Sequence, residues 1–157
     1  MNLNWSRKTL TPQKLGTFCE YYAKMTMASY GMSIYTSEVD DHGIDFIAEK
    51  SPSGFLKFQV KSIRGNSGYV FMKAKNFSPD DPDFHIILLL LRDGALPDVY
   101  VIPACAWKDK TKTMFVYHTY ENKKSESEYG MNISQKNFPQ LQDYRIENFI
   151  DTLTSRL

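Results

Sequence analysis

The sequence predicts an α+β domain in which helices flank a run of β-strands. Apolar residues recur at helical spacing near both ends of the chain. Between those ends, several segments alternate apolar and polar residues, and one segment, FHIILLLL at residues 84–91, is continuously apolar. Periods of 3.6 and 2 residues distinguish helices from strands. The order of helix, strands and helix therefore favours a mixed sheet with helices packed on it.

The composition is that of an ordinary globular protein. A length of 157 residues suits one domain, 1–157, and 42% hydrophobic residues suffice for a core. The net charge of +1 provides no general attraction to nucleic acids or anionic membranes, so anion binding requires a local patch. No signal peptide is visible and the longest apolar run is too short to cross a membrane, so we expect a cytoplasmic protein with no membrane contact.

Two helices are expected. The first begins with Thr11 as its cap and Pro12 at its first position, and Gly31 can end it. The second lies within residues 144–157. Their apolar stripes are Leu15, Phe18, Cys19, Tyr22 and Met25 in the first helix, and Ile146, Phe149, Ile150 and Leu153 in the second.

Strands are expected between the helices, separated by turns rich in Gly, Pro and Asp. The apolar run at 84–91 is typical of a strand covered on both faces. A short helical turn is expected at 104–107, an edge strand at 113–117 and mostly loop at 119–137. The other predicted strands cover residues 32–38, 43–49, 55–63, 69–72 and 99–103.

One predicted hairpin, HGIDFIAEKSPSGFLKFQVKS at residues 42–62, carries polar side chains in an unusual place. Side chains alternate between the two faces of a strand, and the apolar sets of paired strands must face the same core. One apolar face then consists of Ile44, Phe46 and Ala48 with Leu56, Phe58 and Val60. The simplest pairing places Asp45 opposite Gln59, with residues 50–54 as the loop, although a bulge would shift it by one residue.

That pairing brings Asp45, Gln59 and Lys61 into one small volume. Mg²⁺ prefers oxygen ligands and often takes only one or two carboxylates from the protein. A lysine two residues away could orient or deprotonate the attacking water and stabilise developing phosphate charge. Such a group suits hydrolysis of a phosphodiester.

These residues resemble the motif of the PD-(D/E)XK nuclease superfamily, which includes restriction endonucleases, Mrr-type enzymes and archaeal Holliday-junction resolvases. Asp45 in GID matches the family's aspartate, Gln59 in QVK its variable acid and Lys61 its lysine. Glu20 in GTFCEYYAK matches the helix glutamate of many members. The resemblance implies a restriction-endonuclease-like αβββαβ core over residues 11–105, with 106–157 as an extension that contains the closing helix.

The resemblance also implies an activity, hydrolysis of DNA with Mg²⁺ or Mn²⁺. Asp45, Gln59 and Glu20 would bind the metal, and Lys61 would position the water. Double-strand cleavage would favour a homodimer. Gln59 departs from the family's usual acid, which removes a negative charge and should weaken metal binding. Two alternatives therefore stay open: a DNA- or protein-binding module without strong catalysis, and a phosphoesterase acting on RNA or a small nucleotide.

A polar and basic segment follows the motif and is the candidate nucleic-acid contact. The alternative is an ordinary solvated loop. The candidates are Ser62, Arg64, Tyr69, Lys73 and Lys75.

The motif residues also have purely structural interpretations. Asp45 and Lys61 could form a cross-strand ion pair, and Glu20 could pair with Lys24 one helical turn away. Against this, the small residues Gly16 and Ala23 would let the helix approach the sheet and aim Glu20 at the hairpin. The preceding stretch, 40–42, could belong to the metal's surroundings, or Asp40, Asp41 and His42 could simply form a solvated turn.

Overall fold

The computed structural model describes residues 3–6, 8–39, 42–49, 54–121 and 124–155. Asp40, Asp41 and most of the predicted turn at 51–54 lie outside these residues. The described elements are α1 (Pro12–Ser29), β1 (Ser33–Tyr35), β2 (Phe46–Glu49), β3 (Phe55–Arg64), β4 (Gly68–Lys73), η1 (Ala74–Asn76), β5 (Phe84–Leu91), β6 (Asp98–Pro103), η2 (Ala104–Lys108), β7 (Phe115–His118), β8 (Glu128–Ile133), α2 (Phe138–Leu141), η3 (Gln142–Tyr144) and α3 (Ile146–Thr154).

The ends of α1 are as expected. Thr11 caps the helix, since its side chain accepts a hydrogen bond from the backbone N–H of Lys14 at 3.3 Å. Pro12 occupies the first position, where a missing N–H costs nothing. Gly31, with φ of 85°, follows the C-cap Tyr30 in a conformation that favours glycine.

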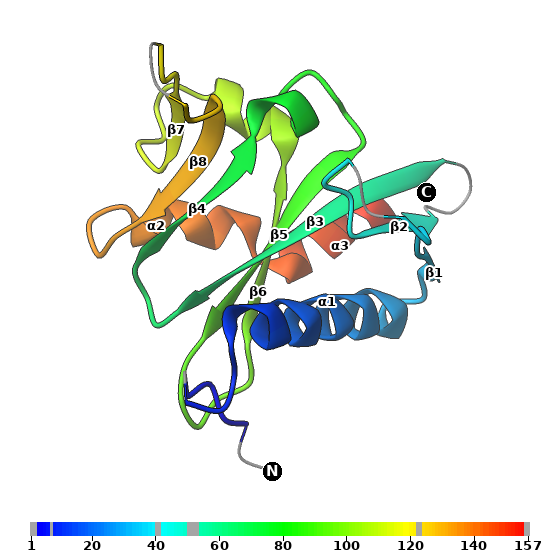
Figure 1. Ribbon diagram of the computed structural model, residues 1–157. Coiled ribbons are helices and arrows are strands. Elements are labelled where there is room, and N and C mark those ends of the chain that lie inside the picture. Colours follow the sequence, from blue (N-terminus) through cyan, green and yellow to red (C-terminus); the bar gives the residue numbers. More distant parts are fainter. Residues whose placement is uncertain (1–2, 7, 40–41, 50–53, 122–123, 156–157) are drawn as a thin grey trace.

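The strands form two sheets. The larger has the order β1-β2-β3-β5-β6, with β3 and β5 parallel and the other pairs antiparallel. The smaller, β4-β8-β7, is antiparallel throughout. Figure 1 shows β4 leaving the turn after β3 and running away from the larger sheet toward β8. The chain therefore passes from one sheet to the other at the turn between β3 and β4.

Strand β5 separates two cores. Ile86, Leu88 and Leu90 pack in the sheet-side core, which lies between the two sheets, and the intervening Ile87, Leu89 and Leu91 pack in the helix-side core, which α1 and α3 cover. Every residue of β5 is buried. This confirms the prediction that the continuous apolar run is a strand covered on both faces.

The prediction of mostly loop over 119–137 missed β8, which lies within this range and is the central strand of the smaller sheet. Its odd-numbered residues Tyr129, Met131 and Ile133 face the sheet-side core. Gly130 and Asn132 alternate with them, so the strand carries only three inward apolar positions. The predicted edge strand at 113–117 is confirmed as β7.

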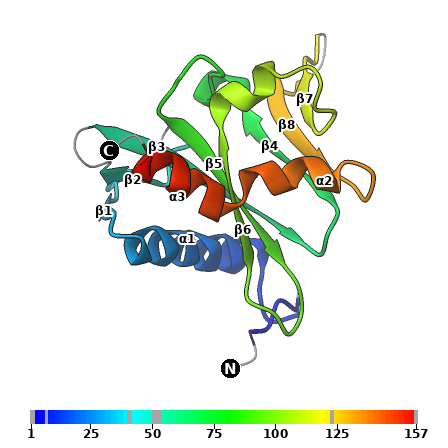
Figure 2. The ribbon, with the colours of Figure 1, turned by 180° about the vertical axis from the view of Figure 1, so that it is seen from behind.

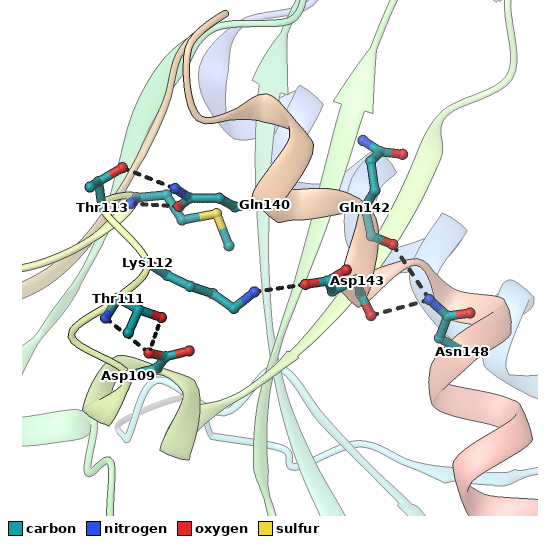
Figure 3. A network of polar contacts seen from close by, with 9 residues as sticks. Asp109, Thr111, Lys112, Thr113, Gln140, Gln142, Asp143 and Asn148 are labelled. Carbon is teal, nitrogen blue, oxygen red and sulfur yellow. Dashed lines mark hydrogen bonds and ion pairs between the residues drawn. The ribbon is translucent and has the colours of Figure 1, made fainter.

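The C-terminal segment closes the structure, and Figure 2 shows α2, η3 and α3 following one another across the side away from the view of Figure 1. The predicted stripe of α3 is confirmed, since Ile146, Phe149, Ile150 and Leu153 all contribute to the helix-side core. A polar network joins this segment to the loop before β7 (Figure 3): Lys112 Nζ lies 2.7 Å from Asp143 Oδ2.

In the described part of the chain, no helix combines the length and apolar character needed to cross a membrane.

Candidate active site

The β2–β3 hairpin has the predicted register from its loop as far as the pair Phe46 and Phe58. Phe46 pairs with Phe58, and β2 ends at Glu49 while β3 begins at Phe55. Beyond this pair the regular ladder stops. The Asp45 N–H donates to the Phe58 carbonyl at 2.8 Å, and the carboxylate oxygen Oδ2 of Asp45 accepts from the Val60 N–H at 2.6 Å. Asp45 thus binds the backbone of β3 on either side of Gln59.

The residues before Asp45 depart from the prediction. Ile44 was expected on the same face as Phe46, but it packs against the sheet-side core, whereas Phe46 lies in the helix-side core. The reason is the turn at Gly43, whose φ is 69°, which keeps Ile44 outside β2. A Cβ atom at Gly43 would lie 3.3 Å from Asn76 Cβ and 3.4 Å from Gln59 Nε2. Gly43 is therefore needed both for its conformation and for its close contacts.

Gln59 carries the most informative polar atom of the site. Its carbonyl oxygen, Oε1, is buried and has no hydrogen-bond partner among the residues that the structure describes. Buried polar atoms are nearly always paired, because an unpaired one loses its interaction with water without compensation. Gln59 lies on the face of β3 that the sheet-side core covers, next to Ile86 of β5 in the parallel register. Its oxygen is therefore available to a ligand such as a cation or water.

Lys61 lies two residues further along the same face of β3. Burial lowers the pKa of its ammonium group, and the negative charge of Asp45 partly offsets that effect. Its Nζ lies 5.8 Å from the centroid of the Phe71 ring on β4. A lysine with a lowered pKa spends more time in the neutral form, which can accept a proton.

Glu20 lies on α1, on the helix-covered side of the larger sheet. Burial is the main cause of the raised pKa of the neighbouring Cys19 thiol, and the charge of Glu20 adds to it. No Glu20–Lys24 ion pair occurs among the described residues, and Lys24 Nζ instead lies 5.6 Å from the Tyr21 ring. Of the two small residues predicted to let α1 approach the sheet, Ala23 is fully buried in the helix-side core. Gly16 has no such role, because a Cβ atom there would meet nothing within 4 Å.

Ser62 and Arg64 point to the same side of β3 as Val60, away from Gln59 and Lys61. The Ser62 side chain lies near the Cys19 thiol and lowers its pKa. The Arg64 guanidinium donates to two backbone carbonyls, that of Trp5 at 2.8 Å and that of Leu10 at 3.0 Å. The structure therefore separates these two predicted nucleic-acid contacts from Lys61.

The other predicted contacts lie on the side of the smaller sheet that faces away from the core. Tyr69 is exposed and its hydroxyl donates to a carboxylate oxygen of Glu128. Lys73 and Lys75 both pair with Glu126, at 3.1 and 2.8 Å. Two further neighbours, Asn76 and Phe71, escaped sequence reasoning. Nothing in their spacing marks them, because they meet the motif only through the fold.

Two side chains of the hairpin offer oxygen donors to a divalent metal ion. They are the Asp45 carboxylate and the buried amide oxygen Gln59 Oε1, and Asp45 hydrogen-bonds the backbone of β3 on either side of Gln59. Hard cations take both kinds of oxygen, and Mg²⁺ completes its shell with water and substrate. The residues present fit a weakly held Mg²⁺ or Mn²⁺ ion. A site made by the protein alone is not indicated, since the described residues contain no group of three or more His, Cys, Asp or Glu side chains suited to a metal.

Comparisons with known proteins concern the fold. No protein-family model matches the chain, and no curated protein matches its sequence significantly. Among solved structures, the Holliday junction resolvase Hjc of the archaeon Archaeoglobus fulgidus aligns with a TM-score of 0.51 and 12% identity, over 87% of this chain and 95% of that one. The bacterial homing endonuclease I-Ssp6803I aligns with a TM-score of 0.54 and 14% identity, over 93% of this chain and 96% of that one. Together with the mixed sheet and its flanking helices, these similarities show that the chain has the restriction-endonuclease-like α+β fold.

Proposed function

We propose that this protein is a metal-dependent nuclease that hydrolyses phosphodiester bonds in DNA. Two neighbouring polar groups on β3 carry the proposal. The Gln59 oxygen is buried and has no partner among the described residues, and the ammonium group of Lys61 is partly buried, with the lowering of its pKa offset in part by the charge of Asp45. The choice of DNA as substrate is supported by the two structural neighbours, a Holliday junction resolvase and a homing endonuclease.

Each residue has a distinct role in the proposed site. Asp45 Oδ1 and Gln59 Oε1 would hold Mg²⁺ or Mn²⁺, which supplies positive charge beside the scissile phosphate. Asp45 Oδ2 stays on the Val60 N–H and so fixes the carboxylate. Lys61 Nζ accepts a proton from the attacking water when neutral and stabilises the phosphate's charge when protonated. Glu20 would take part only through a second metal ion or a water molecule, because α1 packs on the opposite face of the larger sheet from Gln59 and Lys61.

A DNA-binding module without catalysis is the second candidate. One observation favours it: the site brings together a single carboxylate and an amide, and that carboxylate already has one oxygen engaged with the backbone. Such a module would bind DNA without metal and without cleaving it.

The decisive experiment compares cleavage of plasmid and of linear single- and double-stranded DNA by the wild type, Lys61→Ala, Lys61→Arg and the exposed control Lys14→Ala, with Mg²⁺ or Mn²⁺. We expect Lys61→Ala to lose at least about 100-fold in rate, as removal of a general base typically does. Lys61→Arg keeps the charge but cannot accept a proton at working pH, so it should also be impaired. Lys14→Ala should cleave like the wild type.

The pH dependence provides a separate readout. Because Lys61 must be neutral to accept a proton, the rate should rise with pH until the pH reaches its lowered pKa, below the usual value of 10.5. If the wild type bound DNA but did not cleave it with either metal, only the second candidate, the DNA-binding module, would remain. Equal cleavage by the wild type and Lys61→Ala would contradict the assigned site.

A further inference from the structure

We propose that the outer face of the smaller sheet is a stacking surface for unpaired nucleotides of the DNA substrate. The surface consists of Tyr69, Phe71, His118 and Tyr120, and we call it the aromatic face. This inference extends the proposed nuclease function by naming a substrate class, DNA with unpaired bases.

The strand register places these residues on the outer face. In β4, Val70 and Met72 contribute to the sheet-side core, so Tyr69 and Phe71 between them point outward. The pairing of β7 with β8 puts His118 opposite Glu128, on the same outer face. Outward positions of a sheet are normally polar, so exposed rings there call for an explanation.

The rings lie close to one another. Tyr69 and Phe71 have centroids 6.3 Å apart and planes within 20° of parallel, and Tyr69 lies 6.2 Å from His118. His118 in turn lies 6.2 Å from Tyr120. A cavity of about 400 Å³ opens beside three of these rings, and it is lined by Tyr69, Val116, His118, Tyr120 and Asn132. This arrangement offers several ring faces on one surface.

The position of Tyr69 depends on Gly130. A Cβ atom at Gly130 would lie 2.1 Å from Tyr69 Oη, so the ring occupies the space that any other residue would fill. The Tyr69 and Tyr120 hydroxyls both donate to Glu128. The ring is therefore held in place before any ligand arrives, which lowers the entropic cost of stacking.

The location beside Lys61 indicates nucleic acid as the occupant. Lys73 and Lys75 flank the rings, but Glu126 pairs with both and Glu128 accepts from the two tyrosine hydroxyls. The positive charge is therefore supplied by Lys61 of the candidate active site, whose Nζ lies 5.8 Å from the centroid of the Phe71 ring. The aromatic face is thus continuous with the proposed catalytic lysine. Rings beside lysines are the means by which proteins hold single strands, since every base has a flat face to stack. Bases inside a duplex are already stacked and do not expose that face.

The test measures binding without cleavage, by fluorescence anisotropy in EDTA. The probes are a fluorescein-labelled oligothymidylate and a blunt duplex of the same length. Phe71→Ala is compared with Tyr117→Ala, which removes a similarly exposed ring (52% against 46% exposed) from the inner face of the same sheet. Gly130→Ala, which displaces Tyr69 without removing a ring, is a second variant.

We expect Phe71→Ala to weaken binding of the oligothymidylate about tenfold or more, within the range found for loss of one base-stacking ring. Gly130→Ala should weaken it in the same direction, and Tyr117→Ala should not. Affinity for the blunt duplex should stay within twofold in all three. Equal binding by Phe71→Ala and Tyr117→Ala would overturn the proposal.

Sedimentation tests whether the aromatic face is instead an interface between two copies of the chain. If the wild type were a dimer and Phe71→Ala a monomer, with unchanged binding of the oligothymidylate, the stacking proposal would be overturned in favour of that interface. Because the assay contains no metal, it succeeds or fails independently of cleavage. A protein that binds the single strand through Phe71 but cuts nothing would refute the nuclease and leave the aromatic face standing.

Discussion

Gln59 is the residue whose chemistry separates this site from one with two carboxylates. Its buried oxygen has no hydrogen-bond partner in the described part of the chain. Replacing it with glutamate keeps the shape and adds a negative charge next to Asp45. In the metal-free protein that charge is poorly solvated and repelled by Asp45, so the free energy of unfolding should fall. With metal, the second carboxylate should strengthen binding and restore stability.

We therefore predict that Gln59→Glu melts at a lower temperature than the wild type in EDTA, and gains more in melting temperature on addition of Mn²⁺. Thermal unfolding across a Mn²⁺ titration measures both effects. Gln135→Glu makes the same chemical change at an exposed position and should show neither. An equal Mn²⁺ response in both variants would mean that Gln59 does not face a metal site.

At the scale of elements, the helices and the buried strand β5 were predictable because each carries a strong local signal. Thr11 and Pro12 begin α1, and the continuous apolar run fits only a strand covered on both faces. Strand β8 was not predictable, because its outer face holds Gly130 and Asn132, and the space above Gly130 is filled by Tyr69 from another strand. In the same way, the sequence shows that Arg64 is basic but not that its hydrogen bonds go to distant carbonyls.

Arg64 joins the end of β3 to the N-terminal segment. Its two hydrogen bonds to the carbonyls of Trp5 and Leu10 involve a charged donor, a class worth about 1.5–3 kcal/mol each. We predict that Arg64→Lys, which cannot form the same fork, lowers the free energy of unfolding by about 1–3 kcal/mol, measured by urea denaturation. Arg145→Lys, which alters contacts with surface carboxylates, should cost less than about 1 kcal/mol. A loss of DNA affinity in Arg64→Lys without a loss of stability would favour a phosphate contact instead.

At the scale of the whole molecule, the hairpin motif was predictable and its surroundings were not. The alternation in residues 55–61 was enough to place Gln59 and Lys61 on one face of β3. The path of β2 determines two features that the sequence does not show. The strand pairing ends at Phe46, and the Asp45 carboxylate accepts a hydrogen bond from the Val60 N–H. The contact of Lys61 with Phe71 depends on the divergence of the two sheets. Motif spacing identifies the candidate polar groups of β3, whereas the proposed aromatic face depends on the fold.

The two cores on either side of β5 raise the question of whether the chain unfolds as one unit. Each contains one tryptophan: Trp5 is 3% exposed in the helix-side core, and Trp107 is 5% exposed in the sheet-side core. Because β5 contributes to both, the loss of either core should remove the support of the other. Trp107→Phe and Trp5→Phe therefore leave one fluorescent reporter in each core.

We predict that, within each of these variants, fluorescence and far-ultraviolet circular dichroism give the same urea midpoint. Leu89→Ala, added to Trp5→Phe, opens a cavity in the helix-side core and should destabilise by about 2–5 kcal/mol. Its effect should be visible at Trp107, on the opposite side of β5, whereas the control Leu96→Ala, at an exposed position, should change neither signal. If Trp107 kept its midpoint while circular dichroism reported an earlier transition, the cores would be separate folding units. Coincident loss of both signals would instead mean that β5 couples the helices to the sheet that carries the aromatic face.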